Sequence, residues 1–303
     1  MKKNMIGKST IEVSALTLGC MSLGTDKQNA KNIIDFALEM GINHLDTADL
    51  YDFGFNEEIV GEAIKDRRDK IVVTTKVGNH FNAQSKDWYW DPSKTYIQAG
   101  VKESLRRLKT DYIDLYMLHG GTLEDPIEET IEAFEELKKE GVIRTYGISS
   151  IRPNVIREYV AKSSIDAVMT QYSLFDRRPE EETLDFLHQN QISVLARGPL
   201  AKGMLSNQTL KQLERKGQHG YLEYSYEELR NAIHNLSNYN SSLNELAIQY
   251  VITHPAIASA VFGASSIEQV KENTSFNTDI SLDEEIYQEL KAITKPSKYQ
   301  HHR

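Results

Sequence analysis

The chain has 303 residues, of which 40% are hydrophobic and 26% charged, and its formal net charge at pH 7 is −9. This acidic balance argues against nucleic acid or an anionic membrane as a partner, and no apolar run approaches the roughly 18 residues of a membrane span. The start of the chain lacks a signal-peptide core and Cys20 is the only cysteine, so we expect a soluble, cytoplasmic protein without internal disulfides.

Short apolar segments alternate with amphipathic ones along most of the chain. The apolar segments predict strands over residues 16–19, 44–46, 71–76, 113–118, 145–148, 167–170, 193–196 and 258–262. The amphipathic segments predict helices over residues 29–40, 57–64, 93–108, from 126 to a stop at 141, from 153, 179–190, 266–273 and 281–294. Strands that are apolar throughout are typical of parallel strands covered by helices on both faces.

Eight strand-then-helix units predict an α/β fold, the (β/α)8 or TIM barrel, as one domain over residues 1–303. An open doubly wound sheet would show similar alternation, but the turn over residues 19–24 lacks its G-x-G-x-x-G signature. Residues 4–13 predict an N-terminal hairpin, residues 77–92 a long loop, and residues 204–242 a polar, mobile excursion with some helix.

The segment 44–58 carries the first candidate site. Asp46 ends a predicted strand, Tyr51 follows on a loop, and Asn56 has the character of an N-cap for the next helix. A carboxylate at a strand end and a phenol on the following loop are typical of a barrel active site. The alternative is that Asp46 caps a turn while Tyr51 fills a surface groove.

Two later strand ends favour an active site. Lys76 ends the third predicted strand and His119 follows the fourth, and in a parallel barrel these ends share one rim. A lysine cation beside a tyrosine makes the phenol a better acid, a carboxylate holds that lysine in place, and a histidine orients a carbonyl oxygen. Taken alone, Lys76 could extend its ammonium to solvent and His119 could cap a turn.

The same residues lie in segments that resemble the aldo-keto reductase superfamily. The matching segments are residues 45–51, 56–61, 74–76, 118–119, 141–150 and 262–266. The resemblance covers nearly the whole chain and implies an eight-stranded barrel whose N-terminal hairpin plugs the bottom. It also implies that Tyr51 is the general acid, that Asp46 and Lys76 tune it, and that His119 positions the substrate.

The resemblance further implies a nicotinamide cofactor, NADP(H) in preference to NAD(H). The residues expected to bind it are Gly19, Met21, Asp46, Ser149, Ser150, Gln171, Arg197, Gly198, Pro199, Leu200, Lys202, Gly263, Ser265, Gln269, Glu272 and Asn273. Ser149, Ser150 and Gln171 match the nicotinamide end, the segment from Gly198 the pyrophosphate side, and the segment from Gly263 the adenosine end. A helix that begins near Ser266 offers free N–H groups to a phosphate, although this serine pair could simply cap the helix.

Two positions depart from the family pattern. Arg197 stands where many members carry an aromatic residue that stacks on the nicotinamide, and its charge predicts a preference for the reduced cofactor. Ser265 and Ser266 offer hydroxyls where NADP-specific members often have basic residues. Lys271 or basic residues of the polar excursion, namely Lys211, Arg215 and Lys216, could supply that charge.

The predicted substrate pocket consists of Met21, Tyr51, Phe53, Trp88, Trp90 and His119. Aromatic side chains in the loop after the third strand either line an apolar pocket for an aldehyde or ketone or pack that loop onto the barrel. We predict no metal site, and the sequence does not specify the carbonyl compound or the oligomeric state.

Three functions compete. The first is a nicotinamide-dependent reductase of aldehydes or ketones, which the complete set of Asp46, Tyr51, Lys76 and His119 favours. The second is an NADP(H)-binding redox sensor with little turnover, resembling the potassium-channel beta subunits of the same superfamily. The third, a phosphate-binding barrel isomerase, would require a carboxylate base, and no glutamate ends a predicted strand.

Overall fold

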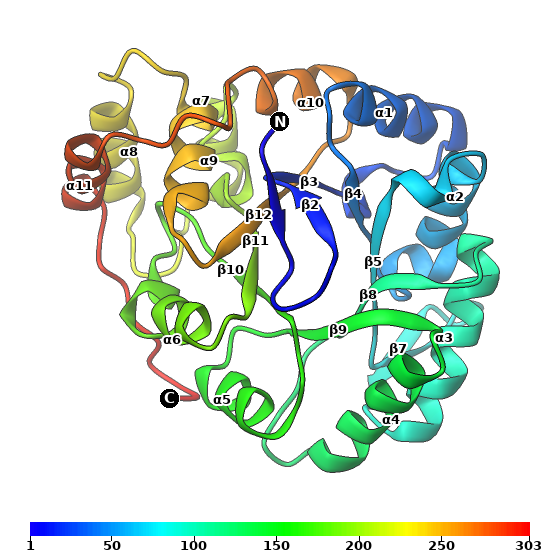
Figure 1. Ribbon diagram of the computed structural model, residues 1–303. Helices are drawn as coiled ribbons and strands as arrows, with labels where there is room; N and C mark the ends of the chain where they lie inside the picture. Colours follow the sequence, from blue (N-terminus) through cyan, green and yellow to red (C-terminus); the bar gives the residue numbers. More distant parts are fainter.

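The computed structural model describes residues 1–303 and contains a closed barrel of eight parallel strands (Figure 1). In order around the barrel, the strands are β3 (Leu16–Gly19), β4 (His44–Asp46), β5 (Val72–Val77), β8 (Ile113–Leu118), β9 (Ile143–Ser149), β10 (Ala167–Gln171), β11 (Ser193–Arg197) and β12 (Ile257–Gly263). Pairing of β12 with β3 closes the barrel, which confirms the predicted fold and excludes an open sheet.

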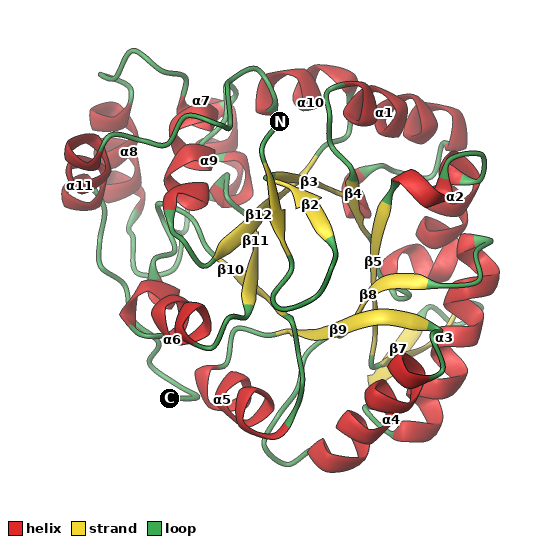
Figure 2. Ribbon diagram, viewed as in Figure 1, coloured by secondary structure: helices red, strands yellow, loops and turns green.

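Helices surround the barrel strands, as Figure 2 shows. Those that follow the strands are α1 (Lys27–Glu39), α2 (Phe55–Ile64), α3 (Lys94–Leu108), α4 (Ile127–Lys139), α5 (Pro153–Lys162), α6 (Thr183–Gln189), α9 (Leu243–Thr253) and α10 (Ile267–Asn273). Short 3-10 helices occur at η1 (Cys20–Ser22), η2 (Tyr51–Gly54), η3 (Arg68–Lys70), η4 (Arg178–Glu181) and η5 (Ala201–Gly203). The predicted C-terminal helix is α11 (Glu284–Ile293), which lies beside α8 (Tyr226–Leu236) at the edge of the molecule (Figure 1).

The N-terminal hairpin closes one end of the barrel. It consists of β1 (Lys3–Met5) and β2 (Glu12–Ser14), which pair antiparallel, and Figure 1 shows it in dark blue across the centre of the barrel. Its apolar side chains pack against interior residues such as Leu115 and Met117 in one buried cluster. The Gly7 N–H donates to Ser193 Oγ at the start of β11, so the plugged end is the one at which the strands begin. The opposite rim, where the strands end, stays open.

One local prediction was wrong, one was confirmed in part, and one helix was not predicted. The expected long loop over residues 77–92 contains a second hairpin, β6 (Asn79–Asn82) and β7 (Asp87–Trp90), which pair antiparallel. The helix expected within the polar segment over residues 204–242 occurs as α7 (Thr209–Lys216) and α8, whose apolar faces are buried. The helix α9 was not predicted, because it is apolar on nearly all sides and shows no clear amphipathic pattern.

Candidate active site

The four predicted catalytic residues lie at the open rim of the barrel. Asp46 ends β4, Lys76 is the penultimate residue of β5, and His119 directly follows β8. These strands are neighbours in the parallel sheet, so their ends meet. Tyr51 begins η2 after β4, where a loop was expected.

Lys76 connects two members of this group. Its Nζ atom donates to Asp46 Oδ1 at 2.7 Å and to the Thr47 carbonyl at 2.7 Å, and it lies 3.5 Å from the Tyr51 hydroxyl. The lysine side chain is fully buried, which excludes the alternative that it extends to solvent. The Tyr51 ring meets the His119 ring edge to face, with 5.9 Å between the ring centres. The four side chains therefore form one contiguous group.

The buried environment determines the protonation of Lys76 and Tyr51. Burial lowers the pKa of Lys76, but the nearby Asp46 carboxylate and Tyr51 oxygen outweigh this effect and raise it above its usual value. Burial raises the pKa of Tyr51, and the Lys76 cation offsets only part of that rise. Lys76 therefore acts in the predicted direction, but burial is the larger effect. At neutral pH Lys76 is a cation and Tyr51 keeps its proton.

His119 is neutral in this environment. Burial, together with the charges of Lys76 and Arg197, lowers its pKa to about 3. Its Nδ1 atom is buried without a hydrogen-bond partner. A neutral imidazole has one N–H to donate, so His119 is suited to hydrogen bonding with a ligand oxygen.

A strained turn holds Tyr51 in place. Asp52 and Phe53 have φ values of 49° and 53°, and Gly54 follows at 90°, a region that residues with a side chain rarely adopt. A β-carbon on Gly54 would lie 2.8 Å from Arg107 Cδ, so both its conformation and its surroundings require glycine. Such strain persists only where neighbouring structure supports it.

The prediction that Asn56 is the N-cap of the following helix was wrong. Gly54 occupies that position, and the Asn56 side chain is buried inside the molecule. Its Nδ2 donates to the Cys20 carbonyl at 2.9 Å, and its Oδ1 accepts from Thr47 Oγ1 at 2.7 Å. Asn56 thus ties α2 to the segments that follow β3 and β4, which lie on either side of the site.

A buried ion pair below the Tyr51 turn was not predicted. Glu57 in α2 accepts from Arg107 Nε in α3 at 2.6 Å, and its other oxygen accepts from Thr75 Oγ1 at 2.5 Å. Glu57 is completely buried and Arg107 nearly so. Nothing in the sequence relates the two residues, since they are 50 positions apart on different helices. The pair anchors both the strained turn and the strand segment next to Lys76.

The predicted cofactor residues lie around the same rim. Gly19, Ser149, Gln171, Arg197 and Gly263 end β3, β9, β10, β11 and β12. The Gly198 backbone is open, because a β-carbon there would meet nothing closer than Gln171 Cγ at 3.8 Å. Gln171 Nε2 donates to the hydroxyl of Tyr221 at 2.8 Å, a residue that sequence reasoning missed because it lies in the segment expected to be mobile.

The segment after β11 carries two cations beside each other. Lys202 lies 5.4 Å above the ring of Tyr221, and Lys216 Nζ, at the end of α7, donates to the Lys202 carbonyl at 2.7 Å. Burial and the charges of Arg215 and Lys202 lower the pKa of Lys216. Both lysine side chains are exposed, so positive charge is concentrated next to the open backbone of Gly198.

The predicted adenosine end lies near α10. The Ser265 N–H donates to Gln269 Oε1 at 2.8 Å, and Ser266 caps the helix through Gln269 N. The capping role considered for this serine pair therefore occurs at Ser266. Asn244 Nδ2 donates to the carbonyl of Glu272 at 2.6 Å and lies 3.4 Å from Asn273 Oδ1.

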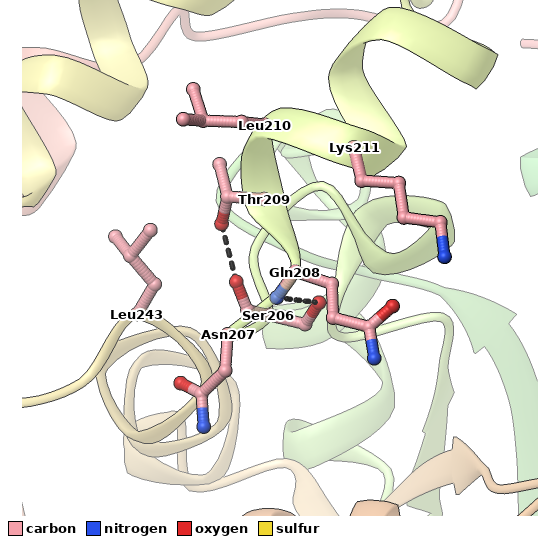
Figure 3. Close-up of a pocket in the computed structure, with 7 residues that line it drawn as sticks. All are labelled: Ser206, Asn207, Gln208, Thr209, Leu210, Lys211 and Leu243. Carbon is pink, nitrogen blue, oxygen red and sulfur yellow. Dashed lines mark hydrogen bonds between the residues drawn. The ribbon is translucent and has the colours of Figure 1, made fainter.

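A pocket of about 480 Å³ borders this end of the site (Figure 3). It is lined by Ser206, Asn207, Gln208, Thr209, Leu210, Lys211 and Leu243. Leu243 precedes Asn244, the residue that contacts Glu272 and Asn273. The pocket thus lies beside the residues predicted for the adenosine end, and it includes none of the four predicted catalytic residues.

The residues predicted for the substrate pocket have different surroundings. Trp90 packs against Gly78 and Gly120, and its Nε1 donates to Asp125 at 3.0 Å. Trp88 and Met21 are 54% and 63% exposed. Trp90 therefore packs the β6–β7 hairpin next to the segment that carries His119, whereas Trp88 remains open to solvent.

Phe53 belongs to the turn that begins with Tyr51. Its ring lies 6.0 Å from that of Phe81 on the β6–β7 hairpin. This contact connects the hairpin to the turn that carries the tyrosine.

None of the helices combines the length and apolarity that a membrane crossing requires.

Comparison with known proteins identifies the family. A sequence profile of the Aldo/keto reductase family matches residues 15–295. The chain is 57% identical to an uncharacterized oxidoreductase of Bacillus subtilis, YqkF, over the full length of both proteins. It is 32% identical to an NADH-specific methylglyoxal reductase of Escherichia coli, over 91% of this chain and 93% of that protein. An aldo-keto reductase from Bacillus halodurans, solved in its holo form, is 52% identical and superposes with a TM-score of 0.96 over 100% of this chain and 99% of that one. This chain belongs to the Aldo/keto reductase family of oxidoreductases.

Proposed function

We propose that this protein is an NADP(H)-dependent oxidoreductase that reduces aldehydes or ketones to alcohols, with Tyr51 as the general acid. The observation that carries the proposal is the position of Lys76 Nζ, which lies 2.7 Å from Asp46 Oδ1 and 3.5 Å from the Tyr51 hydroxyl. A cation held by a carboxylate next to a protonated phenol is suited to proton donation.

Each residue has a defined part in the proton transfer. The Tyr51 O–H bond breaks as its proton moves to the carbonyl oxygen, and Lys76 stabilises the phenolate that remains. Asp46 keeps Lys76 charged and in place. His119, neutral, donates a hydrogen bond to the same oxygen and orients the carbonyl. When bound, a reduced nicotinamide would supply the hydride needed for the reduction.

The residues at the rim fit such a cofactor. Ser149, Ser150 and Gln171 provide hydroxyl and amide groups for the carboxamide at the nicotinamide end. The open backbone of Gly198 and the exposed ammonium of Lys202 fit the pyrophosphate. The segment from Gly263 through Ser265, Gln269, Glu272 and Asn273 serves the adenosine end, next to the pocket in Figure 3.

Preference for NADP(H) over NAD(H) depends on the adenosine end. The exposed Ser265 side chain follows β12, and its hydroxyl is available to a 2′-phosphate if Gln269 releases it. The Escherichia coli relative is named for NADH, so this preference needs its own test. We expect Ser265→Asp to weaken NADPH binding about tenfold or more and to leave NADH binding nearly unchanged, because a carboxylate repels the phosphate. Fluorescence titration measures both affinities, with Ser265→Asn as the uncharged control, and equal weakening of both cofactors would contradict the assignment.

The proposal is tested by cofactor binding followed by turnover. Purified protein is titrated with NADPH and NADH and then assayed with a panel of carbonyl compounds. The panel includes methylglyoxal, which appears in the name of one relative, an aromatic aldehyde and a simple ketone. Tight NADPH binding with turnover supports the reductase. Binding without turnover on any carbonyl compound favours the redox sensor. Failure of both cofactors to bind excludes the reductase as well as the sensor.

We expect the pH dependence of the reaction to show no contribution from the ionisation of a histidine. Because the pKa of His119 lies at about 3, its ring is neutral throughout the range in which an ordinary histidine, with a pKa of about 6.5, would titrate. The pKa of Tyr51 is raised, so the acid stays protonated until the solution is strongly alkaline. A profile of kcat/KM for carbonyl reduction should be flat from about pH 5.5 to 8 and fall at alkaline pH. An acid-side loss of activity centred near pH 6.5 would contradict the neutral role of His119.

A further inference from the structure

Asp49 carries a buried carboxyl group between Asp46 and Tyr51 in the chain. Its side chain is 1% exposed, and its Oδ1 atom has no hydrogen-bond partner. Its Oδ2 atom lies 3.4 Å from the hydroxyl of Tyr96 in α3, which makes a shorter hydrogen bond, of 3.0 Å, to the Asn79 carbonyl. A buried negative charge requires a cation and several hydrogen bonds, and this position provides neither to Asp49.

One cation serves two carboxyl groups in this part of the interior. Arg107 in α3 pairs with Glu57 in α2 at 2.6 Å, and both Glu57 oxygens accept hydrogen bonds. The other titratable groups near Asp49 are the phenols of Tyr96 in α3 and Tyr116 in β8, which supply no positive charge. Burial, and then the Glu57 carboxylate, raise the pKa of Asp49 well above its usual value, and Arg107 offsets only part of the rise. Ionisation of Asp49 would therefore leave a net negative charge inside the molecule.

Asp49 also connects the turn to the elements behind it. Its N–H donates to the Lys76 carbonyl in β5 at 3.2 Å, and Tyr51 follows two residues later. The Tyr96 hydroxyl beside its carboxyl group binds the start of the β6–β7 hairpin through Asn79. Asp49 thus lies where the turn, β5, α3 and the hairpin meet.

We propose that Asp49 is a neutral carboxylic acid in the folded protein and that, in this form, it is a positioning residue for the turn that carries Tyr51. A neutral carboxyl group has an O–H to donate and leaves the interior without net charge. Ionisation places a negative charge beside Glu57 without a free cation, which weakens the packing of the turn against β5 and α3. Activity should then fall at alkaline pH before Tyr51 loses its proton, because a phenol ordinarily titrates about six pH units above a carboxyl group. This kinetic consequence rests on the proposed function, whereas the protonation state of Asp49 does not.

The first test is the pH dependence of stability in Asp49→Asn, whose amide has the shape of a neutral carboxyl group and does not ionise. The folded carboxyl group keeps a proton that the unfolded chain releases above about pH 4, so the wild-type protein should lose stability relative to the variant as the pH rises. We expect the ratio of the unfolding equilibrium constants, wild type over variant, to rise about tenfold for each pH unit from about pH 5 to 7. Urea denaturation measures both constants. The control Asp111→Asn changes an exposed aspartate, and its ratio should stay constant, whereas a constant ratio for Asp49→Asn would overturn the proposal.

The second test is the pH profile of kcat in two variants. Asp49→Asn should keep kcat at pH 7 within about threefold of the wild-type value and extend activity by about one pH unit or more on the alkaline side. Asp49→Ala, which lacks a polar group at this position, should lower kcat about tenfold or more. If the negative charge were required, Asp49→Asn would be as damaging as Asp49→Ala. That result, or an alkaline fall that coincides in Asp49→Asn and the wild-type protein, would overturn the proposal.

The wild-type protein provides a test even if neither variant folds. Infrared spectroscopy of protein with isotope-labelled aspartate side chains should show the C=O stretch of a protonated carboxyl group at pH 7, and the absence of this band would count equally against the proposal. Neither the infrared band nor the stability ratio requires cofactor or substrate. Absence of turnover would therefore refute the proposed function and not the protonation state of Asp49, so the two failures are distinguishable.

Discussion

Replacing Tyr51 with phenylalanine is expected to lower kcat for carbonyl reduction by a factor of about 100 to 10,000. The substitution removes the proton that Tyr51 donates in the proposed mechanism, while the ring that meets His119 edge to face remains. NADPH binding should change less than threefold, because the lost hydroxyl makes one long contact, to Lys76 at 3.5 Å. Steady-state kinetics and a fluorescence titration on the same preparation measure both quantities.

Tyr239→Phe is the matched control for this substitution. It also deletes one phenolic hydroxyl, which binds Glu289 at the surface of the molecule near α11, and it should leave kcat within twofold of the wild-type value. Retention of more than a tenth of the activity in Tyr51→Phe would show that another group donates the proton.

Arg107→Met is expected to lower the free energy of unfolding by about 3–5 kcal/mol. The substitution leaves Glu57 as a buried carboxylate without its cation, and breaking a buried ion pair from one side costs this much. Urea denaturation measures the loss. A second consequence should follow at the site, because Arg107 also packs on Gly54: the turn that carries Tyr51 loses support, and kcat should fall as well.

Two variants show whether the cause is the buried charge. Arg106→Met changes the neighbouring arginine of the same helix, whose side chain is 64% exposed and paired with Glu103 at the surface, and it should cost less than about 1 kcal/mol. The double variant Glu57→Gln/Arg107→Met removes both charges and should be more stable than Arg107→Met alone. A loss in Arg107→Met no larger than that in Arg106→Met would rule out the buried pair as a major source of stability.

The sequence predicted strands and helix ends accurately where neighbouring residues in the chain determine them. The strands β3, β4 and β8 have the predicted bounds. Apolar residues dominate β3 and β8, Leu45 lies between the polar ends of β4, and clear helix starts and stops flank the strands. Ser93, the predicted helix start, and Ser266, one of the two serines considered as a possible cap, each cap a helix. Asn56 shows the limit of such reasoning. It is a good capping residue followed by acidic residues, yet Cys20 and Thr47, in the segments after β3 and β4, hold its amide inside the molecule.

Hairpin β6–β7 and helix α9 show a second limit of prediction from local sequence patterns. The hairpin is recognisable only from its cross-strand pairing, since residues 82–87 contain no glycine turn signal. Helix α9 is buried on several sides, which removes the amphipathic pattern by which helices are recognised. In both cases packing against the rest of the molecule determined the structure.

The sequence by itself determined the barrel and the identities of its four candidate catalytic residues, because parallel strand ends share one rim whatever their separation along the chain. Only the tertiary structure decided their charge states. Burial keeps Tyr51 protonated and His119 neutral, and closure of the barrel places Arg197 opposite Lys76. The Glu57–Arg107 pair likewise exists only in the folded molecule. These properties depend on distance and on exclusion of water, which residues far apart in the sequence acquire only when the chain has folded.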